Sequence, residues 1–245
     1  MDLELKDRRA IVTAASKGLG RACAETLIAE GARVYIASRD SKAIESTAKA
    51  INAAGWSATD VSKPAEPAAL VDAAIDRLGG LDIMVVNTGG PPPGVLETLP
   101  LASWDDAFNL VLMSAVRLVR AAIPHLKQSD QGRIVVITSI SVRQPIPNLV
   151  LSSSFRAAVT GMAKSLSAEL APDRITVNCL APDAIRTDAL ARLGDLHKME
   201  ERAPMKRLGE PVEVGAACAF LCSRQAGYIT GQTLGIDGGA LLGVH

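Results

Sequence analysis

The sequence has no excess of either charge, because 26 lysine and arginine residues balance 26 aspartate and glutamate residues. A chain without a basic excess has no overall field that attracts nucleic acid or an anionic membrane surface. We therefore expect a small-molecule substrate as the partner, and we expect neither nucleic acid nor a membrane to be bound.

Cysteine is scarce, and its four residues form neither a CxxC pair nor a regular framework. Their neighbours are apolar, so we expect reduced thiols in the core, with no disulfide and no metal site. No basic start precedes an apolar stretch with a small-residue cleavage site, and no uninterrupted apolar run reaches the roughly 18 residues of a membrane span. These absences predict a soluble, cytoplasmic protein. The cysteines are Cys23, Cys179, Cys218 and Cys222.

Apolar residues are plentiful, at 48% of the 245 residues, while 21% are charged. That composition supplies enough apolar surface to bury helices against both faces of a sheet. The Pro/Gly-rich stretch from Gly89 to Gly94 is too short to separate two domains and directly follows an expected strand. We expect one domain over residues 1–245, with this stretch as an active-site loop.

Short apolar runs alternate with longer helical patterns from the start of the chain. The runs lack strict polar alternation, as expected for strands that helices cover on both faces. Consecutive βαβ units with right-handed crossovers build a doubly wound parallel α/β sheet, a Rossmann fold, whose ligands bind at the carboxyl ends of the strands. The expected strands are residues 10–13, 33–38, 81–87, 133–139 and 175–181, and the expected helices end at Glu30 and Ala54 or span 103–126 and 151–171.

Residues 187–207 form the longest irregular stretch, with Pro182 before it and Pro204 within it. The stretch follows a strand on the expected ligand edge. Because a segment in that place can close over a bound substrate and exclude water, we interpret it as a candidate substrate lid.

A glycine-containing turn lies between the first expected strand and the first expected helix, and it reads Thr13-Ala-Ala-Ser-Lys-Gly-Leu-Gly20. Backbone N–H groups at such a turn, and the positive end of the helix behind it, suit a pyrophosphate. A glycine pair alone is weak evidence, and the bland alternative is a flexible helix start. The position between strand and helix favours a dinucleotide-binding turn.

The turn resembles the TGxxxGxG motif of the short-chain dehydrogenase/reductase family, with Ala14 in place of the first glycine. The resemblance covers almost the entire chain, and the overall pattern is similar to the 3-oxoacyl-[acyl-carrier-protein] reductase branch. It includes a counterpart of the family's PGxxxT loop over the nicotinamide, in which Asp183 replaces glycine. The resemblance implies cofactor contacts by Thr13, Ser16, Lys17, Gly18, Leu19, Gly20, Ser38, Arg39, Asp60, Val61, Asn87, Thr88, Gly89, Arg156, Pro182, Ile185 and Thr187.

The choice between NADP(H) and NAD(H) depends on the groups around the adenosine ribose. An acidic residue accepts a free 2′-hydroxyl, whereas cations accept a 2′-phosphate. The resemblance places Arg39, from the end of the second strand, and Lys17, from the turn, beside that phosphate. We therefore predict NADP(H) rather than NAD(H). Asp40 is the alternative, because a strand end shifted by one residue would put a carboxylate there instead.

Carbonyl reductases of this family need a proton donor next to the carbon that accepts hydride. Family members use tyrosine, with a lysine four residues later that holds the nicotinamide ribose, and a serine and an asparagine complete the group. Here the YxxxK motif reads SSSFR, which puts Ser152 at the tyrosine position and Arg156 at the lysine position. Ser139 and Asn109 fall at the serine and asparagine positions.

These replacements change the expected chemistry. The hydroxyl of Ser152 lacks the acidity of a phenol, whose reference pKa is about 10. Arg156 keeps a charge for the ribose contact, but arginine is not expected to donate a proton near neutral pH. Losing a positioned acid typically costs about 10²–10⁴ in rate. Substitutes that remain open are His125 or His197 as the acid and Ser141 with Arg143 as a clamp for an anionic substrate, against the bland alternative of solvated polar groups.

Three functions remain compatible with the sequence. The first is an NADP(H)-dependent oxidoreductase that acts on a carbonyl or hydroxyl substrate with a degenerate catalytic tetrad. The second is a catalytically impaired nucleotide-binding regulatory protein, and the third is a non-redox lyase or isomerase that uses the same pocket. The family resemblance favours the first. It also implies a homotetramer, with subunit contacts through the 151–171 helix and the 234–244 segment.

Overall fold

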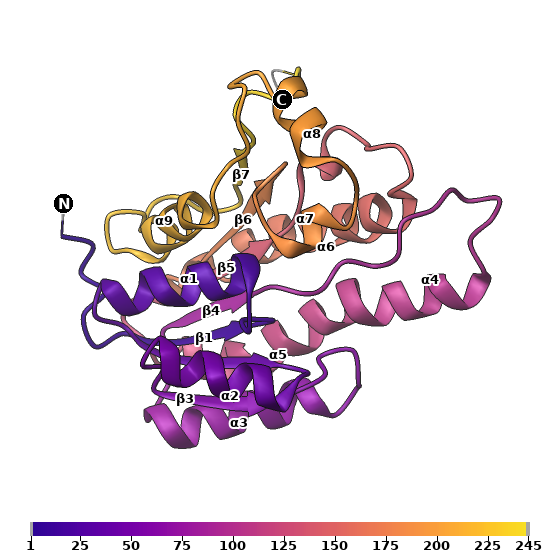
Figure 1. The fold of residues 1–245 in the computed structure, drawn as a ribbon. Coiled ribbons are helices and arrows are strands. Elements are labelled where there is room, and N and C mark those ends of the chain that lie inside the picture. Colours follow the sequence, from indigo (N-terminus) through magenta and orange to yellow (C-terminus); the bar gives the residue numbers. More distant parts are fainter. Residues whose placement is uncertain (1, 244–245) are drawn as a thin grey trace.

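A computed structural model describes residues 2–243, so that Met1, Val244 and His245 lie outside the described residues. In the described part, seven parallel strands form one sheet in the order β3-β2-β1-β4-β5-β6-β7, which confirms the predicted doubly wound Rossmann fold (Figure 1). The order reverses between β1 and β4, and sheets of this kind bind ligands at that point, outside the carboxyl ends of the strands. The strands are β1 (Arg9–Thr13), β2 (Arg33–Ser38), β3 (Gly55–Ala58), β4 (Ile83–Val86), β5 (Arg133–Ile137), β6 (Thr176–Pro182) and β7 (Thr233–Ile236).

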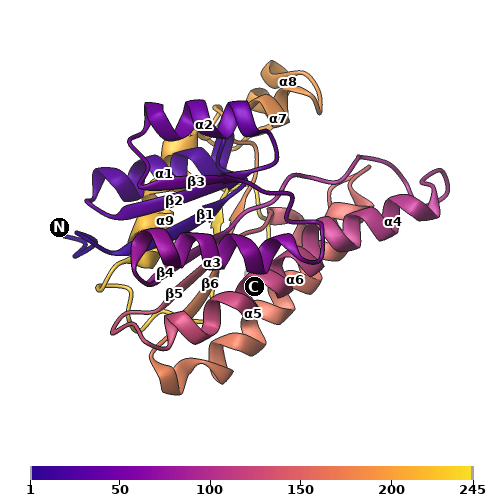
Figure 2. The ribbon, with the colours of Figure 1, turned by 90° about the horizontal axis from the view of Figure 1, so that it is seen from below.

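Helices cover both faces of the sheet, and Figure 2 shows the two layers. Alternate residues of β1 serve the two layers, because Ile11 packs into one buried cluster while Ala10 and Val12 pack into the other. A strand buried on both sides has no polar face, which explains the missing polar alternation in the sequence. One layer holds α1 (Gly18–Ala29), α2 (Ser41–Ala50) and α9 (Pro211–Cys222), and the other holds α3 (Glu66–Leu78), α5 (Ser114–Leu126) and α6 (Val150–Glu169).

A helical segment without a break runs over Leu101–Leu126, where a π-helical turn joins α4 to α5. By length and composition alone this segment is apolar enough to cross a membrane, a test that buried core helices also pass. Its second half packs against β4 and α3 as part of the layer described above. The shorter helices are α4 (Leu101–Ala107), η1 (Phe108–Met113), η2 (Ile140–Val142), η3 (Ala171–Asp173), α7 (Asp188–Ala191) and α8 (Leu196–Arg202).

The structure differs from the sequence-based expectation in residues 51–80. The helix expected to reach Ala54 ends at Ala50, because Asn52 adopts a left-handed conformation with φ 55°. β3 and α3 follow, and neither was expected from the sequence. None of the four residues of β3 is fully buried, so this edge strand lacks the apolar run by which the other strands are recognised.

The candidate lid, residues 187–207, is also more ordered than expected. It is not irregular throughout, because it contains the two short helices α7 and α8. Thr187 accepts a hydrogen bond from the backbone N–H of Leu190, and Asp195 accepts one from that of His197. Threonine and aspartate are preferred residues at helix N-termini, and these two side chains begin the two helices.

The four cysteines are buried and free, as predicted.

Candidate active site

The turn from Thr13 to Gly20 connects β1 to α1 at the carboxyl edge of the sheet. A Cβ on Gly20 would lie 2.4 Å from the carbonyl oxygen of Ala14, so this packing requires glycine. Lys17, the N-cap of α1, makes no side-chain capping hydrogen bond. The first N–H groups of the helix therefore lack a side-chain partner, and together with the helix dipole they suit an anion. The turn fits the pyrophosphate of a dinucleotide.

Thr13 and Asn87, two predicted cofactor residues, hold this turn in place. The buried Thr13 hydroxyl donates to the carbonyl oxygen of Asn87 (2.7 Å) and accepts from the Asn87 N–H (2.9 Å). The Asn87 amide lies 3.4 Å from the carbonyl oxygen of Ala14. A Cβ on Gly89 or Gly90 would meet no atom within 4 Å, so the loop after β4 borders open space. The side chains of Thr13 and Asn87 are therefore engaged in hydrogen bonds within the protein, and the two glycines offer only backbone to the open space.

Ser38 ends β2 beside the phosphate turn, and Arg39 and Asp40 follow it. The Ser38 and Ser16 hydroxyl oxygens lie 3.0 Å apart. Asp40 caps α2, because its carboxylate accepts a hydrogen bond from the backbone N–H of Ala43 (2.9 Å). Arg39 is exposed, and β2 ends one residue before it. The Asp40 carboxylate is therefore engaged at the start of α2, whereas the Arg39 side chain is exposed.

Asp60 lies at the same end of the sheet as Arg39. Partial burial opposes its ionisation, but hydrogen bonds from Ser62 and the nearby charge of Arg39 lower the pKa of Asp60. Val61, its neighbour, is buried in the core. The loop after β3 and the end of β2 therefore border one region. The contacts of Asp60 and Val61 with the adenosine end of a dinucleotide stay a prediction.

The start of the candidate lid lies against the phosphate turn. Lys17 Nζ is 3.4 Å from Asp188 Oδ2, and both side chains are exposed. A Cβ on Gly18 would lie 3.7 Å from the methyl group of Thr187. The Lys17–Asp188 pair was not predictable from the sequence, because only the fold shows that residues 171 positions apart are neighbours.

Ser152 and Arg156 lie one turn apart on the same face of α6. The Arg156 Nε–H donates to Ser152 Oγ over 3.2 Å. Arg156 Nη1 donates to the carbonyl oxygens of Ile137 (3.0 Å) and Thr138 (3.4 Å), at the end of β5. Among the ion pairs in residues 2–243, none includes Arg156. Burial lowers the pKa of this guanidinium to about 10.

Ser139 lies beside this pair, because it directly follows the carbonyl group of Thr138. Its Oγ accepts a hydrogen bond from the Ser141 N–H over 3.1 Å. Ser139 and Ser152 are both half-buried, and no hydrogen bond found within the described chain uses the hydrogen of either hydroxyl. Two O–H donors are therefore available at the end of β5. Ser141 is 3% exposed, and its buried hydroxyl has no partner.

Asn109, the fourth predicted catalytic residue, has other partners. Its amide donates to the carbonyl oxygen of Asp105 (3.0 Å) and accepts from Arg117 (3.1 Å). Arg117 also donates to the carbonyl oxygen of Ser62, after β3. Within residues 2–243 no hydrogen bond links Asn109 to Ser139, so the structure brings three of the four predicted residues together. The catalytic role of Asn109 stays a prediction.

The two histidines considered as substitute acids lie apart from the serines. His197 is 77% exposed and lies 3.4 Å from Glu201 on its own helix, α8. His125 is in the last turn of α5, the end that leads into the amino end of β5. Neither contacts Ser139 or Ser152 through the hydrogen bonds of the described residues.

A cavity of about 330 Å³ lies beside the candidate lid, between the ends of β6 and β7. Asp183, Asp237 and Met205 line it together with the buried Ile185. Burial raises the pKa of Asp183, and the charge of Asp237 acts in the same direction. The predicted cofactor residues Pro182 and Ile185 are both buried.

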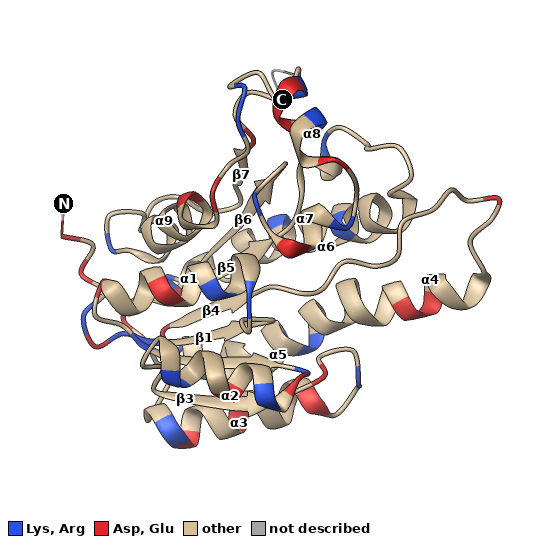
Figure 3. Cartoon of the chain, viewed as in Figure 1, with Lys and Arg blue, Asp and Glu red and all other residues tan. Residues whose placement is uncertain are grey.

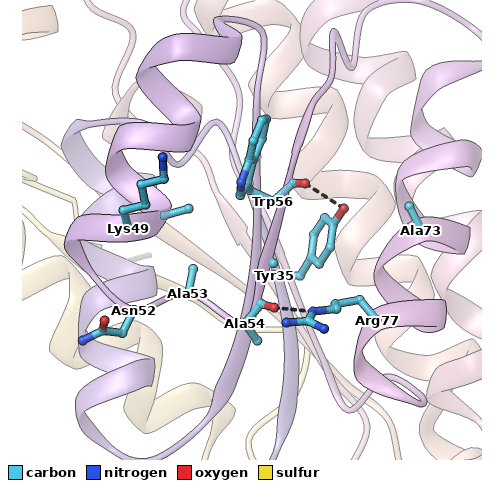
Figure 4. A pocket seen from close by; sticks show the side chains of 10 residues that line it. Tyr35, Lys49, Asn52, Ala53, Ala54, Trp56, Ala73 and Arg77 are labelled. Carbon is cyan, nitrogen blue, oxygen red and sulfur yellow. Dashed lines mark hydrogen bonds between the residues drawn. The ribbon is translucent and has the colours of Figure 1, made fainter.

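A second cavity, of about 510 Å³, lies between α2 and α3 at the start of β3 (Figure 4). The Tyr35 hydroxyl donates to the carbonyl oxygen of Trp56, and Arg77 donates to that of Ala54. These bonds satisfy backbone groups of the edge strand, which gives both side chains a structural role.

Figure 3 shows acidic and basic residues interspersed along the chain, as the balanced charge implies.

Known proteins share both the sequence pattern and the fold. Residues 13–240 match the family described as "Enoyl-(Acyl carrier protein) reductase". The chain is 34% identical over 245 residues to Dehydrogenase/reductase SDR family member 4 of Oryctolagus cuniculus, covering 96% of this chain and 94% of that protein.

Two solved structures have nearly the same fold. One is L-sorbose reductase from Gluconobacter frateurii, complexed with NADPH and L-sorbose, with a TM-score of 0.93, 29% identity and 100% of each chain covered. The other is 3-ketoacyl-(acyl-carrier-protein) reductase from Brucella melitensis, complexed with NADH, with a TM-score of 0.92, 33% identity, and 97% of this chain and 99% of that chain covered. The phosphate turn, the sheet order and these similarities together show that the chain belongs to the short-chain dehydrogenase/reductase family of oxidoreductases.

Proposed function

We propose that this protein is an NADP(H)-dependent oxidoreductase that reduces a carbonyl group or oxidises the corresponding hydroxyl. The pair of hydroxyls from Ser139 and Ser152 carries this proposal. Each oxygen already accepts an N–H bond, from Ser141 and Arg156 respectively, so each hydrogen is left to donate to a substrate oxygen. A hydroxyl donor placed at a carbonyl oxygen polarises the carbonyl and stabilises the oxyanion formed from it.

The dinucleotide fits the phosphate turn through backbone groups. Gly20 permits the close packing of the turn, and the uncapped start of α1 favours the pyrophosphate. Preference for the 2′-phosphate is supported by Lys17 and Arg39, because Asp40 is engaged in capping α2. One structural relative binds NADPH and the other NADH, so this preference depends on the residues of the chain itself. When bound, the reduced nicotinamide supplies a hydride to the substrate carbon.

Arg156 contributes a positive charge behind Ser152. Its guanidinium is held by the carbonyl oxygens of Ile137 and Thr138, so it cannot swing away from the serine without breaking those bonds. A fixed charge in a buried site stabilises a developing oxyanion more strongly than the same charge in water. The fixed charge of Arg156 therefore favours an oxyanion that is hydrogen-bonded to Ser152.

The test is turnover with a panel of aldehydes, ketones and alcohols, followed by the absorbance of NADPH. We expect Ser139→Ala to lower kcat by about 10²–10³, the usual effect of removing one oxyanion donor. Ser154→Ala is the matched control, because Ser154 is exposed on the same helix, and its activity should stay at the wild-type level. Tight NADPH binding without turnover of any substrate would contradict the proposal.

The second candidate function is nucleotide-dependent regulation without catalysis. It is favoured by the absence of a tyrosine near Ser139 in the described structure. Tyr35 is bound to the edge strand β3, and Tyr228 is fully exposed, away from the core. If Ser152→Tyr combined with Arg156→Lys creates turnover that the wild type lacks, the native protein is the regulatory form. The non-redox lyase or isomerase alternative requires product formation without a nicotinamide cofactor.

We propose a homotetramer in the cytoplasm as the working form. Exposed apolar side chains support subunit contacts on two surfaces. Leu101 is 84% exposed at the start of α4, next to the aromatic pair Trp104 and Phe155. Leu242 is 86% exposed in the closing segment, whose last predicted contact residue, Val244, lies outside the described residues. Light scattering should give four times the 25.6-kDa chain mass. The four free thiols support a reducing compartment.

A further inference from the structure

We propose that the carboxylate of Asp183 selects substrates that carry a cationic amine near the reacting carbonyl group. This inference rests on the oxidoreductase function proposed above, and it names the class of substrate. The substrate is an amino ketone in the reduction direction and the corresponding amino alcohol in the oxidation direction. Asp183 binds the ammonium group in the cavity beside the candidate lid, while Ser139 and Ser152 bind the carbonyl oxygen.

Asp183 lies close to Ser139 because two paired strands carry these residues. β5 and β6 pair in register up to Ile137 and Leu180, and the Thr138 N–H donates to the carbonyl oxygen of Leu180 over 2.7 Å. Ser139 is still extended, with φ −163° and ψ 156°, so it lies beside the last residue of β6, and Asp183 follows that residue. Strands lie about 4.8 Å apart and rise about 3.3 Å per residue, so the backbones of Ser139 and Asp183 are within about 10 Å of each other. One small molecule can reach both.

The Asp183 carboxylate has no cation as a partner within the described chain. It is half-buried, and the one hydrogen bond that it accepts from the described residues comes from the N–H of its neighbour Ala184. None of the ion pairs in residues 2–243 includes it. Burial and the nearby charge of Asp237 raise the pKa of Asp183, which shows that its ionised form is under-stabilised in the free protein. A ligand that brings a cation to this carboxylate supplies the missing partner.

The other charged side chains around the cavity are already engaged. Arg207, the one cation among the described lining residues, donates two hydrogen bonds of 2.7 and 2.8 Å to Glu213. The two oxygens of Asp237 each accept a backbone N–H from the turn after β7, at 3.1 and 2.9 Å. The cavity therefore keeps a net negative charge, and Asp183 is the lining carboxylate with free acceptor capacity. Such a cavity attracts a cationic ligand group and repels an anionic one.

The size and the apolar walls of the cavity favour an organic amine. Its volume of about 330 Å³ lies in the range of small-molecule sites. Ile185, Ile236 and Met205 line it, and their side chains suit the methyl or methylene groups next to an ammonium nitrogen. A Cβ on Gly238 would lie 3.5 Å from the Met205 side chain, so the end of the candidate lid packs against the turn after β7. Within residues 2–243 no group of three or more His, Cys, Asp or Glu side chains could hold a metal ion, which leaves the organic cation.

The first test compares three methyl ketones of similar size and different charge. Dimethylaminoethyl methyl ketone is cationic near neutral pH, isoamyl methyl ketone is its neutral isostere, and levulinate is anionic. Turnover is followed by the absorbance of NADPH. We expect the wild-type kcat/KM to decrease in that order, with a difference of about 10- to 100-fold between the cationic ketone and its neutral isostere, as for a hydrogen bond to a charged group. Equal values for these two ketones overturn the proposal.

Two variants assign the preference to Asp183. Asp183→Asn keeps the shape of the side chain and removes its charge, and Asp183→Gly introduces the glycine of the family motif. Both should lose the preference for the cationic ketone and keep the wild-type kcat/KM for isoamyl methyl ketone. Glu201→Gln is the matched control, because Glu201 is 65% exposed on α8 and does not line the cavity, and it should keep the preference. An equal loss in Glu201→Gln would show that the charge of the whole lid, and not Asp183, selects the substrate.

A binding measurement separates this proposal from the oxidoreductase function. A ketone cannot accept a hydride from NADP⁺, so calorimetric titration of the protein with NADP⁺ present reports ketone affinity without turnover. We expect the cationic ketone to bind the wild type about 10- to 100-fold more tightly than it binds Asp183→Asn. If this difference appears but no carbonyl or alcohol is turned over, the oxidoreductase function is wrong and the charge selectivity of the cavity stands. Turnover of ketones without any preference for the cation overturns the role of Asp183 and leaves the oxidoreductase function in place.

Discussion

Lys17 Nζ lies 3.4 Å from Asp188 Oδ2, so an ion pair between exposed side chains ties the phosphate turn to the start of α7. Asp188 competes with a 2′-phosphate for the lysine, and its charge also repels that group. We therefore predict that Asp188→Asn binds NADPH about 1.4- to fivefold more tightly, as expected for an exposed pair worth about 0.2–1 kcal/mol. Calorimetric titration measures this change.

NADH has no 2′-phosphate, and its affinity for Asp188→Asn should match that for the wild type. Asp76→Asn is the charge-matched control, because Asp76 is exposed on α3, away from the turn. An equal gain in affinity for both cofactors would show that Asp188 acts on the pyrophosphate or on the lid instead.

Ala14 is strained in the phosphate turn, since its φ is +47° and residues with a Cβ rarely adopt that region. We predict that Ala14→Gly raises the free energy of unfolding by about 0.5–1 kcal/mol, measured by urea denaturation. Ala15→Gly is the control, because Ala15 is fully buried and has no positive φ. It should lose about 1 kcal/mol. Destabilisation of both variants alike would show that Ala14 is relaxed in its native conformation.

Asp82 holds together the amino edge of the sheet. Its carboxylate accepts two bonds of 2.8 Å from the Arg9 guanidinium and one of 2.6 Å from Ser129. Burial opposes ionisation, but these hydrogen bonds lower the pKa of Asp82. Because the folded pKa lies below the unfolded value of about 3.9, this stabilisation is complete above that pH and is lost as the pH falls through the folded pKa.

We predict that Asp82→Asn loses about 2–4 kcal/mol of unfolding free energy at pH 7. Below about pH 4 the difference from the wild type should narrow, because the native carboxylate becomes protonated as well. Urea denaturation at several pH values checks both statements. Asp130→Asn is the control, since Asp130 also pairs with an arginine but is 62% exposed, and its loss should stay below about 1 kcal/mol. A difference that does not depend on pH would contradict this explanation.

Tyr35 protects the edge of the sheet. Its hydroxyl donates to the carbonyl oxygen of Trp56 over 2.9 Å and lies 2.6 Å from the Ser57 hydroxyl oxygen. We predict that Tyr35→Phe lowers the free energy of unfolding by about 1 kcal/mol, the usual net value of a hydrogen bond. The matched control is Tyr228→Phe, because Tyr228 is fully exposed, and its thermal midpoint should not change. Equal midpoints for both variants would show that the Tyr35 hydroxyl contributes nothing.

The sequence predicted the parts of the fold that have strong local signals. The apolar runs that became β1, β2, β4, β5 and β6 stood out because each is buried on both faces. The edge strand β3 was missed because its residues are only partly buried, and Asn52 ended α2 early through a left-handed conformation that the sequence pattern did not reveal. Local sequence patterns indicate which residues are buried, and few residues of an edge strand are fully buried.

The sequence predicted which residues belong to the candidate site, but it did not predict the hydrogen bonds that these residues make. Ser152 and Arg156 are hydrogen-bonded, and Arg156 also donates to the carbonyl oxygen of Thr138, the residue before Ser139. The direction of the Arg156 side chain was not predictable, because it depends on the carbonyl oxygens of Ile137 and Thr138, which belong to another element. Asn109 shows the same limit, since its partner Arg117 also donates to the carbonyl oxygen of Ser62 on another element.

The most direct measurement is a calorimetric titration of the purified protein with NADPH and with NADH, repeated for Arg39→Ala. The account predicts that the wild type binds NADPH more tightly than NADH, and that Arg39→Ala loses about 10- to 100-fold in affinity for NADPH alone, as expected for a charge-assisted bond of about 1.5–3 kcal/mol. Binding of neither cofactor, or equal affinities that Arg39→Ala leaves unchanged, would contradict it.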